Sequence, residues 1–101
     1  MSTRGYPTPL LRHLPLRERP VSRVVDYGAH ACNLTELLAA VVGGSHQIEI
    51  ARALLARFGD VTSIARAPVE ELAQVDWLGK ARAAALKAAL EIGRRLQLEA
   101  A

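Results

Sequence analysis

The sequence has few of the features that stabilise small secreted proteins or anchor a chain in a membrane. Cys32 is the single cysteine, so no intramolecular disulfide can form. The longest apolar stretches are interrupted by Glu36 or by Gly43 and Gly44, well short of the roughly 20 residues that span a bilayer. The first residues contain no apolar run that resembles a signal peptide. We therefore expect a cytoplasmic protein without a membrane-spanning helix.

Aromatic residues are also scarce. They make up 4% of the chain, whereas 50% of its 101 residues are hydrophobic, and alanine and leucine supply much of that half. This composition favours closely packed helices over a β-rich core, and the length accommodates one small domain. The predicted fold is all-α, a compact bundle of five or six short helices.

Proline and positive charge are concentrated at the N-terminus. Residues 1–20 contain four of the five prolines, and residues 1–23 carry a net charge of +4 while residues 24–101 carry −1. Proline lacks a backbone donor and disfavours a helical conformation of the residue before it. The sequence predicts an extended arm over residues 1–20, mobile over residues 1–16 unless contacts hold it, and a helical domain over residues 21–101.

Capping residues and glycines predict where the helices begin and end. The expected segments are a short helix that Gly28 closes, a helix at 34–42 that Asn33 or Thr35 caps, a helix at 46–58 between Ser45 and Gly59, a short helix around 61–65, and a helix from Pro68 to about residue 74. In the helix at 46–58, one face is apolar and carries Ile50, Ala51, Leu54, Leu55 and Phe58.

The last helix is predicted to run from about residue 79 to residue 98. At about 100° per residue, its expected buried side comprises Ala81, Ala85, Leu86, Ala88, Ala89, Leu90, Ile92 and Leu96. An arc of charged residues lies on the other side and comprises Lys80, Lys87, Glu91, Arg94 and Arg95. The local excess of positive charge on this helix can attract phosphate.

Residues 69–95 resemble a helix-hairpin-helix motif. Val75, Leu78 and Gly79 match its turn, and the alanines that follow match its second helix, which is rich in small residues. In this motif the turn amides and the positive end of the second helix bind a nucleic-acid phosphate without reading sequence. The predicted DNA-binding residues are Gly79, Lys80, Arg82 and Lys87.

A weak internal repeat predicts a second hairpin that pairs with the first. A shift of 35 residues places residues 34–55 on residues 69–90 and matches Gly44 with Gly79. The identities are few in a sequence rich in alanine and leucine, so chance similarity is the alternative explanation.

Trp77 departs from the motif because it stands where the first glycine is expected. Tryptophan does not adopt a positive φ cheaply, so either the turn is altered or the indole covers the binding site. The indole can stack on a base or sugar, but in a protein with so few aromatic residues we favour a core anchor. The turn itself can equally be a compact connection with no ligand.

Several segments, in matching order and spacing, resemble the N-terminal domain of the RadC family, also designated UPF0758. They are residues 18–20, 27–29, 34–39, 51–59, 70–72 and 88–95, and the resemblance covers roughly residues 17–96. It implies a helix-hairpin-helix module that precedes a zinc-binding JAB1/MPN domain in full-length members. Trp77 and a short turn at residues 42–46 depart from the family pattern.

The sequence offers no recognisable catalytic, metal or cofactor site. His13, His30 and His46 are scattered and do not supply the paired histidines of a JAB1/MPN zinc site. We therefore expect no enzyme activity, but a non-catalytic accessory module that binds the DNA backbone weakly and without sequence preference. The alternative is a docking module that positions a JAB1/MPN domain or another protein. The family name carries a DNA-repair role that these residues do not themselves show.

Overall fold

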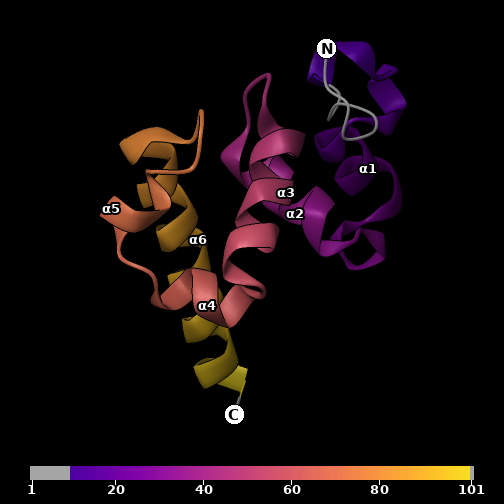
Figure 1. Cartoon of the computed structure of the whole chain (residues 1–101). Coiled ribbons are helices and arrows are strands. Elements are labelled where there is room, and N and C mark those ends of the chain that lie inside the picture. The colour runs from indigo at the N-terminus through magenta and orange to yellow at the C-terminus, as the bar shows by residue number, and fades with distance from the viewer. Residues whose placement is uncertain (1–9, 101) are drawn as a thin grey trace.

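Between residues 10 and 100, the part that the computed structural model describes, the chain folds into six α-helices (Figure 1). They are α1 (Pro20–Tyr27), α2 (Leu34–Val42), α3 (Gln47–Phe58), α4 (Val61–Arg66), α5 (Val69–Leu72) and α6 (Gly79–Ala100). Three single-turn 3₁₀ helices, η1 (Leu11–His13), η2 (Leu16–Glu18) and η3 (Ala29–Ala31), accompany them, and these residues form no strand. The prediction of an all-α fold is confirmed.

Local capping signals account for most helix boundaries. Pro20 opens α1, and Gly28 ends it with a φ of 88°. The α2 helix spans the predicted residues 34–42, and its first turn holds a complete capping box. In this box the Asn33 side chain accepts the Glu36 backbone N–H at 2.8 Å, and the Glu36 carboxylate accepts the Asn33 backbone N–H at 3.0 Å.

Three helix boundaries differ from the prediction. The α3 helix begins at Gln47 with His46 at its N-cap, and Ser45 does not cap it. Pro68 is the N-cap residue of α5 and not its first helical residue, and α5 ends at Leu72 because the chain then turns toward α6. Such shifts of one or two residues are usual at helix ends.

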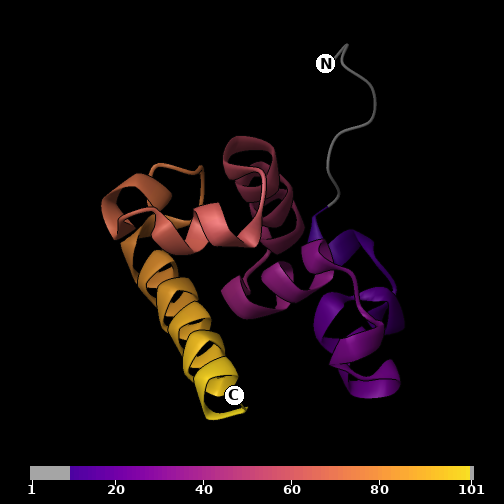
Figure 2. The same cartoon turned by 90° about the horizontal axis from the view of Figure 1, so that it is seen from below.

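The core lies where α2, α3 and the first half of α6 meet, with α4 and α5 closing its side (Figures 1 and 2). Its buried residues are Leu38, Ala39, Val42, Ile48, Ile50, Ala51, Leu54, Ile64, Ala67, Leu72, Val75, Leu78, Ala83 and Leu86. The predicted apolar face of α3 is confirmed, because Ile50, Ala51 and Leu54 are buried while Leu55 and Phe58 pack against the cluster.

The buried side of α6 differs from the prediction. Ala83 and Leu86 are fully buried, whereas Ala85, Ile92 and Leu96 of the predicted side are exposed, as are Ala81 and Ala88. The helix carries apolar residues on two faces, about 140° apart. Contacts with α2, α4 and α5 bury the face that contains Ala83 and Leu86. All residues of the helix from Ile92 to Ala100 are exposed, and the end of α6 reaches beyond α4 (Figure 1). The protruding end of α6 contributes to the radius of gyration of 14.0 Å. A compact domain of about 100 residues has a radius of gyration of about 13 Å.

The N-terminal segment is more ordered than an extended arm. Residues 1–9 lie outside the described part of the chain, but η1 and η2 occupy residues 11–18, so the extended conformation predicted there is wrong. The Leu11 backbone N–H donates to the carbonyl of Ser45 at 3.0 Å, and Leu14 packs against the core. An apolar side chain every few residues is sufficient to hold this segment against the domain despite its prolines.

Candidate nucleic-acid interface

The turn between α5 and α6 exposes its backbone at Gly79. Gly79 begins α6 with a φ of 71°, and apart from its chain neighbours and the nearby backbone of α6 itself, no heavy atom of the described residues lies within 4 Å of the position that a Cβ would occupy. The first N–H groups of a helix have no partner within the helix and lie at its positive end. The first turn of the 22-residue α6 contains no acidic residue. The exposed start of α6 is therefore a candidate site for an anion.

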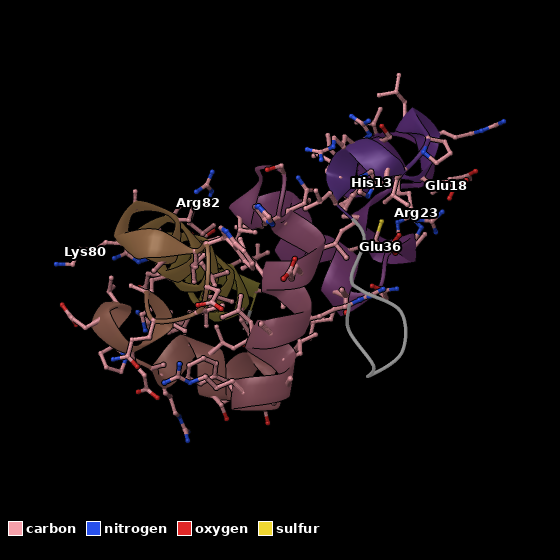
Figure 3. The ribbon with its side chains drawn as sticks, turned by 45° about the horizontal axis from the view of Figure 1, so that its top comes forward. His13, Glu18, Arg23, Glu36, Lys80 and Arg82 are labelled. Carbon is pink, nitrogen blue, oxygen red and sulfur yellow. The ribbon has the colours of Figure 1, made fainter. Side chains whose placement is uncertain are left out.

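Two predicted binding residues lie beside this turn. Lys80 and Arg82 are both exposed in the first turn of α6. Their side chains extend in different directions, as Figure 3 shows, so they do not converge on one point. An extended ligand with several negative charges fits this arrangement better than a single small anion.

Arg82 also contacts the turn between α2 and α3. Its guanidinium lies against the backbone of Gly44, so that a Cβ at residue 44 would be 2.8 Å from Nη2 and 3.3 Å from Cζ. Gly44 has a φ of 82°, and its neighbour Gly43 has a φ of 68°. The turn before α3 and the turn before α6 therefore lie side by side. Each contains a glycine of positive φ, and the internal repeat matched these two glycines, Gly44 and Gly79.

Trp77 joins the same two turns from the surface. Its indole stacks on the imidazole of His46, with ring centroids 4.2 Å apart and planes inclined by 4°. Because 53% of Trp77 is exposed, the interpretation of a core anchor is wrong. No atom of the indole lies within 4 Å of the position that a Cβ at Gly79 would occupy.

The backbone at Trp77 takes a left-handed conformation that favours glycine. Trp77 has a φ of 65° and is the one non-glycine residue of positive φ between residues 10 and 100. This conformation costs a non-glycine residue about 1–2 kcal/mol. The stacking contact with His46 acts against this strain.

Lys87 lies away from the turn. It is about two helical turns further along α6, and its Nζ donates to the backbone carbonyl of Ala65 in α4. Carbonyls in the last turn of a helix have no partner within that helix, so this contact closes the end of α4. The structure does not bring Lys87 together with Lys80 and Arg82.

The remaining charges of the predicted basic arc are partly neutralised. Glu91 accepts hydrogen bonds from Arg94 at 2.8 and 2.9 Å and from Arg95 at 2.9 Å. These bonds, first from Arg94 and then from Arg95, lower the pKa of Glu91 from 4.5 to about 2. Lys80 and Arg82, by contrast, form no ion pair with any described residue.

The described residues offer little for other chemistry. Within residues 10–100 no group of three or more His, Cys, Asp or Glu side chains could hold a metal ion. The thiol of Cys32 lies 3.6 Å from the carbonyl oxygen of Gly28, to which it donates. In the same part of the chain, no helix has both the length and the apolar character to cross a membrane.

Two residues of the interface were not predicted as site residues, Gly44 and His46. The pairing of Gly44 with Gly79 in the internal repeat was the available signal for the first. Nothing local marked His46, because its contact with Trp77 joins residues 31 positions apart in the sequence.

The fold and the paired turns define a small all-α module built from two helical hairpins. The chain belongs to the UPF0758 family, whose N-terminal domain matches residues 11–84. A UPF0758 protein of Roseiflexus castenholzii is 46% identical over 92 residues, which cover 87% of this chain and 40% of that protein. A UPF0758 protein of Protochlamydia amoebophila is 38% identical over 89 residues, covering 84% of this chain and 38% of the relative.

A third relative, from Coprothermobacter proteolyticus, is 39% identical over 99 residues, or 94% of this chain and 42% of the relative. The chain thus spans about 40% of the length of the curated relatives that it matches. No solved structure matches the chain.

Proposed function

We propose that this chain is a non-catalytic accessory module that binds the DNA backbone weakly and without sequence preference. The binding residues are Gly79, Lys80 and Arg82 at the turn before α6. The observation that carries the proposal is the exposed start of α6 at Gly79, beside two exposed cations. Apart from chain neighbours and the nearby backbone of α6, no heavy atom of the described residues lies within 4 Å of a Cβ position there. The resemblance to the RadC family, whose name carries a DNA-repair role, agrees with this proposal.

The chemistry of the turn favours phosphate over bases. Free amides at a helix N-terminus and cationic side chains bind phosphate oxygens, which are the same for every sequence. Lys87 adds only long-range attraction, because its ammonium group is bonded to Ala65 in α4. With two or three phosphates neutralised, we expect a Kd of roughly 10–100 μM, in the range of non-specific binding.

A titration of labelled duplex DNA tests the proposal. Fluorescence anisotropy at several salt concentrations gives the affinity and the number of neutralised phosphates, with an expected slope of log K against log salt of about −2 to −3. Lys80→Glu is expected to weaken binding to unrelated sequences equally. Arg52→Glu, which makes the same charge change on the exposed side of α3, is the matched control and is expected to have a much smaller effect.

The N-terminal arginines are the competing binding residues. Arg12 and Arg17 are exposed, and a variant that carries Arg12→Gln and Arg17→Gln removes their charge without altering the helical domain. If this variant loses DNA binding while Lys80→Glu binds normally, the turn before α6 is structural and the proposal is overturned.

A second candidate function is docking of a JAB1/MPN-type domain, the domain that the RadC resemblance implies. The observation that favours it is the uncovered apolar face of α6, where Ile92 and Leu96 are 68% and 66% exposed. The curated relatives have about three fifths of their length beyond the matched region, which is sufficient for such a domain.

Docking is tested with the unmatched part of the Roseiflexus castenholzii relative as a separate protein. If docking occurs, calorimetry will detect binding to this chain, and Leu96→Glu will abolish it while Lys80→Glu leaves it unchanged. Absence of binding at high micromolar concentrations would exclude this function for α6.

A further inference from the structure

Gly44 has two separate reasons to be a glycine, and one of them concerns Arg82. Its φ of 82° disfavours any other residue, and a Cβ at this position would lie 2.8 Å from the Arg82 Nη2, 3.3 Å from Cζ and 3.5 Å from Nε. Adjacent Gly43 also has a positive φ, of 68°, but no heavy atom lies within 4 Å of its Cβ position. Of these two adjacent glycines, Gly44 leaves room for the Arg82 guanidinium because it has no side chain, whereas Gly43 has no such neighbour.

The contact links the two hairpins through a cation. Arg82 belongs to the first turn of α6, whereas Gly44 belongs to the turn between α2 and α3. Both residues are exposed, so the guanidinium remains accessible while one side of it rests on the backbone of Gly44. The missing side chain at residue 44 leaves the guanidinium room to take this orientation beside the turn between α2 and α3.

From this contact we infer that Gly44 positions Arg82 to bind a second phosphate of the same DNA strand, so that both hairpins and not α6 alone hold the strand. This inference rests on the proposed DNA binding. Lys80 and Arg82 extend in different directions (Figure 3), which places their ligands at separate points. The ligand is therefore a polynucleotide with consecutive phosphates, not a mononucleotide or inorganic phosphate.

The two adjacent glycines supply a matched pair of variants. Gly43→Ala and Gly44→Ala both place a side chain at positive φ, but only Gly44→Ala displaces the Arg82 guanidinium. We expect Gly44→Ala to weaken duplex DNA binding about 3- to 10-fold and to lower the salt slope by about one phosphate, while Gly43→Ala changes affinity less than about twofold. Thermal unfolding of both variants measures how much stability each loses because alanine is strained at a positive φ.

A double-mutant cycle shows whether the effect passes through Arg82. In the Arg82→Gln background, Gly44→Ala is expected to cause no further loss of DNA affinity, because the group that it displaces is already absent. Additive losses would overturn the inference. If Gly44→Ala does not fold, Arg82→Lys takes its place, since it keeps the charge but loses the planar guanidinium, and it is expected to weaken binding.

The experiment separates this inference from the function on which it rests. If Lys80→Glu weakens DNA binding but Gly43→Ala and Gly44→Ala behave alike, the inference is wrong and the proposed function stands. If the unmodified chain does not bind DNA, both are wrong. Displacement of DNA by a mononucleotide at the same phosphate concentration as a competitor oligonucleotide would overturn the requirement for consecutive phosphates.

Discussion

The imidazole of His46 and the indole of Trp77 lie parallel with their centroids 4.2 Å apart, and this contact joins the turn before α3 to the turn before α6. It holds together the two turns that carry the candidate interface. Trp77 makes this contact from a backbone with a φ of 65°. Stacking and backbone strain therefore act in opposite directions at the same residue.

Two substitutions of Trp77 separate these effects. Trp77→Gly removes the stack but also the backbone strain, whereas Trp77→Ala removes the stack and keeps the strain. We expect the alanine variant to be less stable than the glycine variant by about 1 kcal/mol, measured by urea unfolding. Equal stability of the two variants would show that residue 77 does not have a positive φ.

The two apolar faces of α6 are expected to respond differently when one leucine on each face is replaced by alanine. Leu86 is 1% exposed, and Leu86→Ala is expected to lower the free energy of unfolding by about 2–5 kcal/mol. Leu96 is 66% exposed, and Leu96→Ala is expected to change it by no more than about 0.5 kcal/mol. Chemical unfolding of both variants of this chain checks the orientation of the helix, and a large loss for Leu96→Ala would contradict it.

The first turn of α2 combines a cap with an ion pair. Asn33→Ala removes the capping side chain and is expected to cost about 1 kcal/mol. Glu36→Gln keeps an acceptor for the Asn33 N–H but removes the ion pair with Arg23 of α1, which Figure 3 shows beside Glu36. This variant is expected to lose about 0.2–1 kcal/mol in dilute buffer and less in 1 M salt. A salt-independent loss would mean that the ion pair does not contribute.

The lowered pKa of Glu91 predicts a pH dependence of α6. A pKa of about 2 in the folded chain, against an ordinary value of 4.5, means that the unfolded chain binds this proton more tightly. The resulting stabilisation is complete above about pH 4.5 and is lost as the pH falls toward 2. NMR titration of the Glu91 carboxyl measures the pKa directly. Arg94→Gln is expected to raise it more than Arg95→Gln, and no change in either variant would contradict the contacts.

Much of the fold could be predicted from the sequence because helix ends depend on local chemistry. The capping box at Asn33 and the glycines after α1 and α3 act within a few residues of the chain, and α2 spans the predicted residues. The face of α3 was also predictable, since only one of its faces is apolar. The predicted turn residues Gly79, Lys80 and Arg82 lie together because they are neighbours in sequence.

Local signals in the sequence were enough to establish that the chain is helical and where most helices begin and end. Which apolar face of α6 is buried depends on the elements packed against it, because periodicity identifies apolar positions but not the partner that covers them. The same holds for the placement of Trp77 on His46, of Arg82 on Gly44 and of Lys87 at the end of α4. Each of these contacts joins residues more than 20 positions apart, so it depends on how distant helices and turns pack together and not on any local signal.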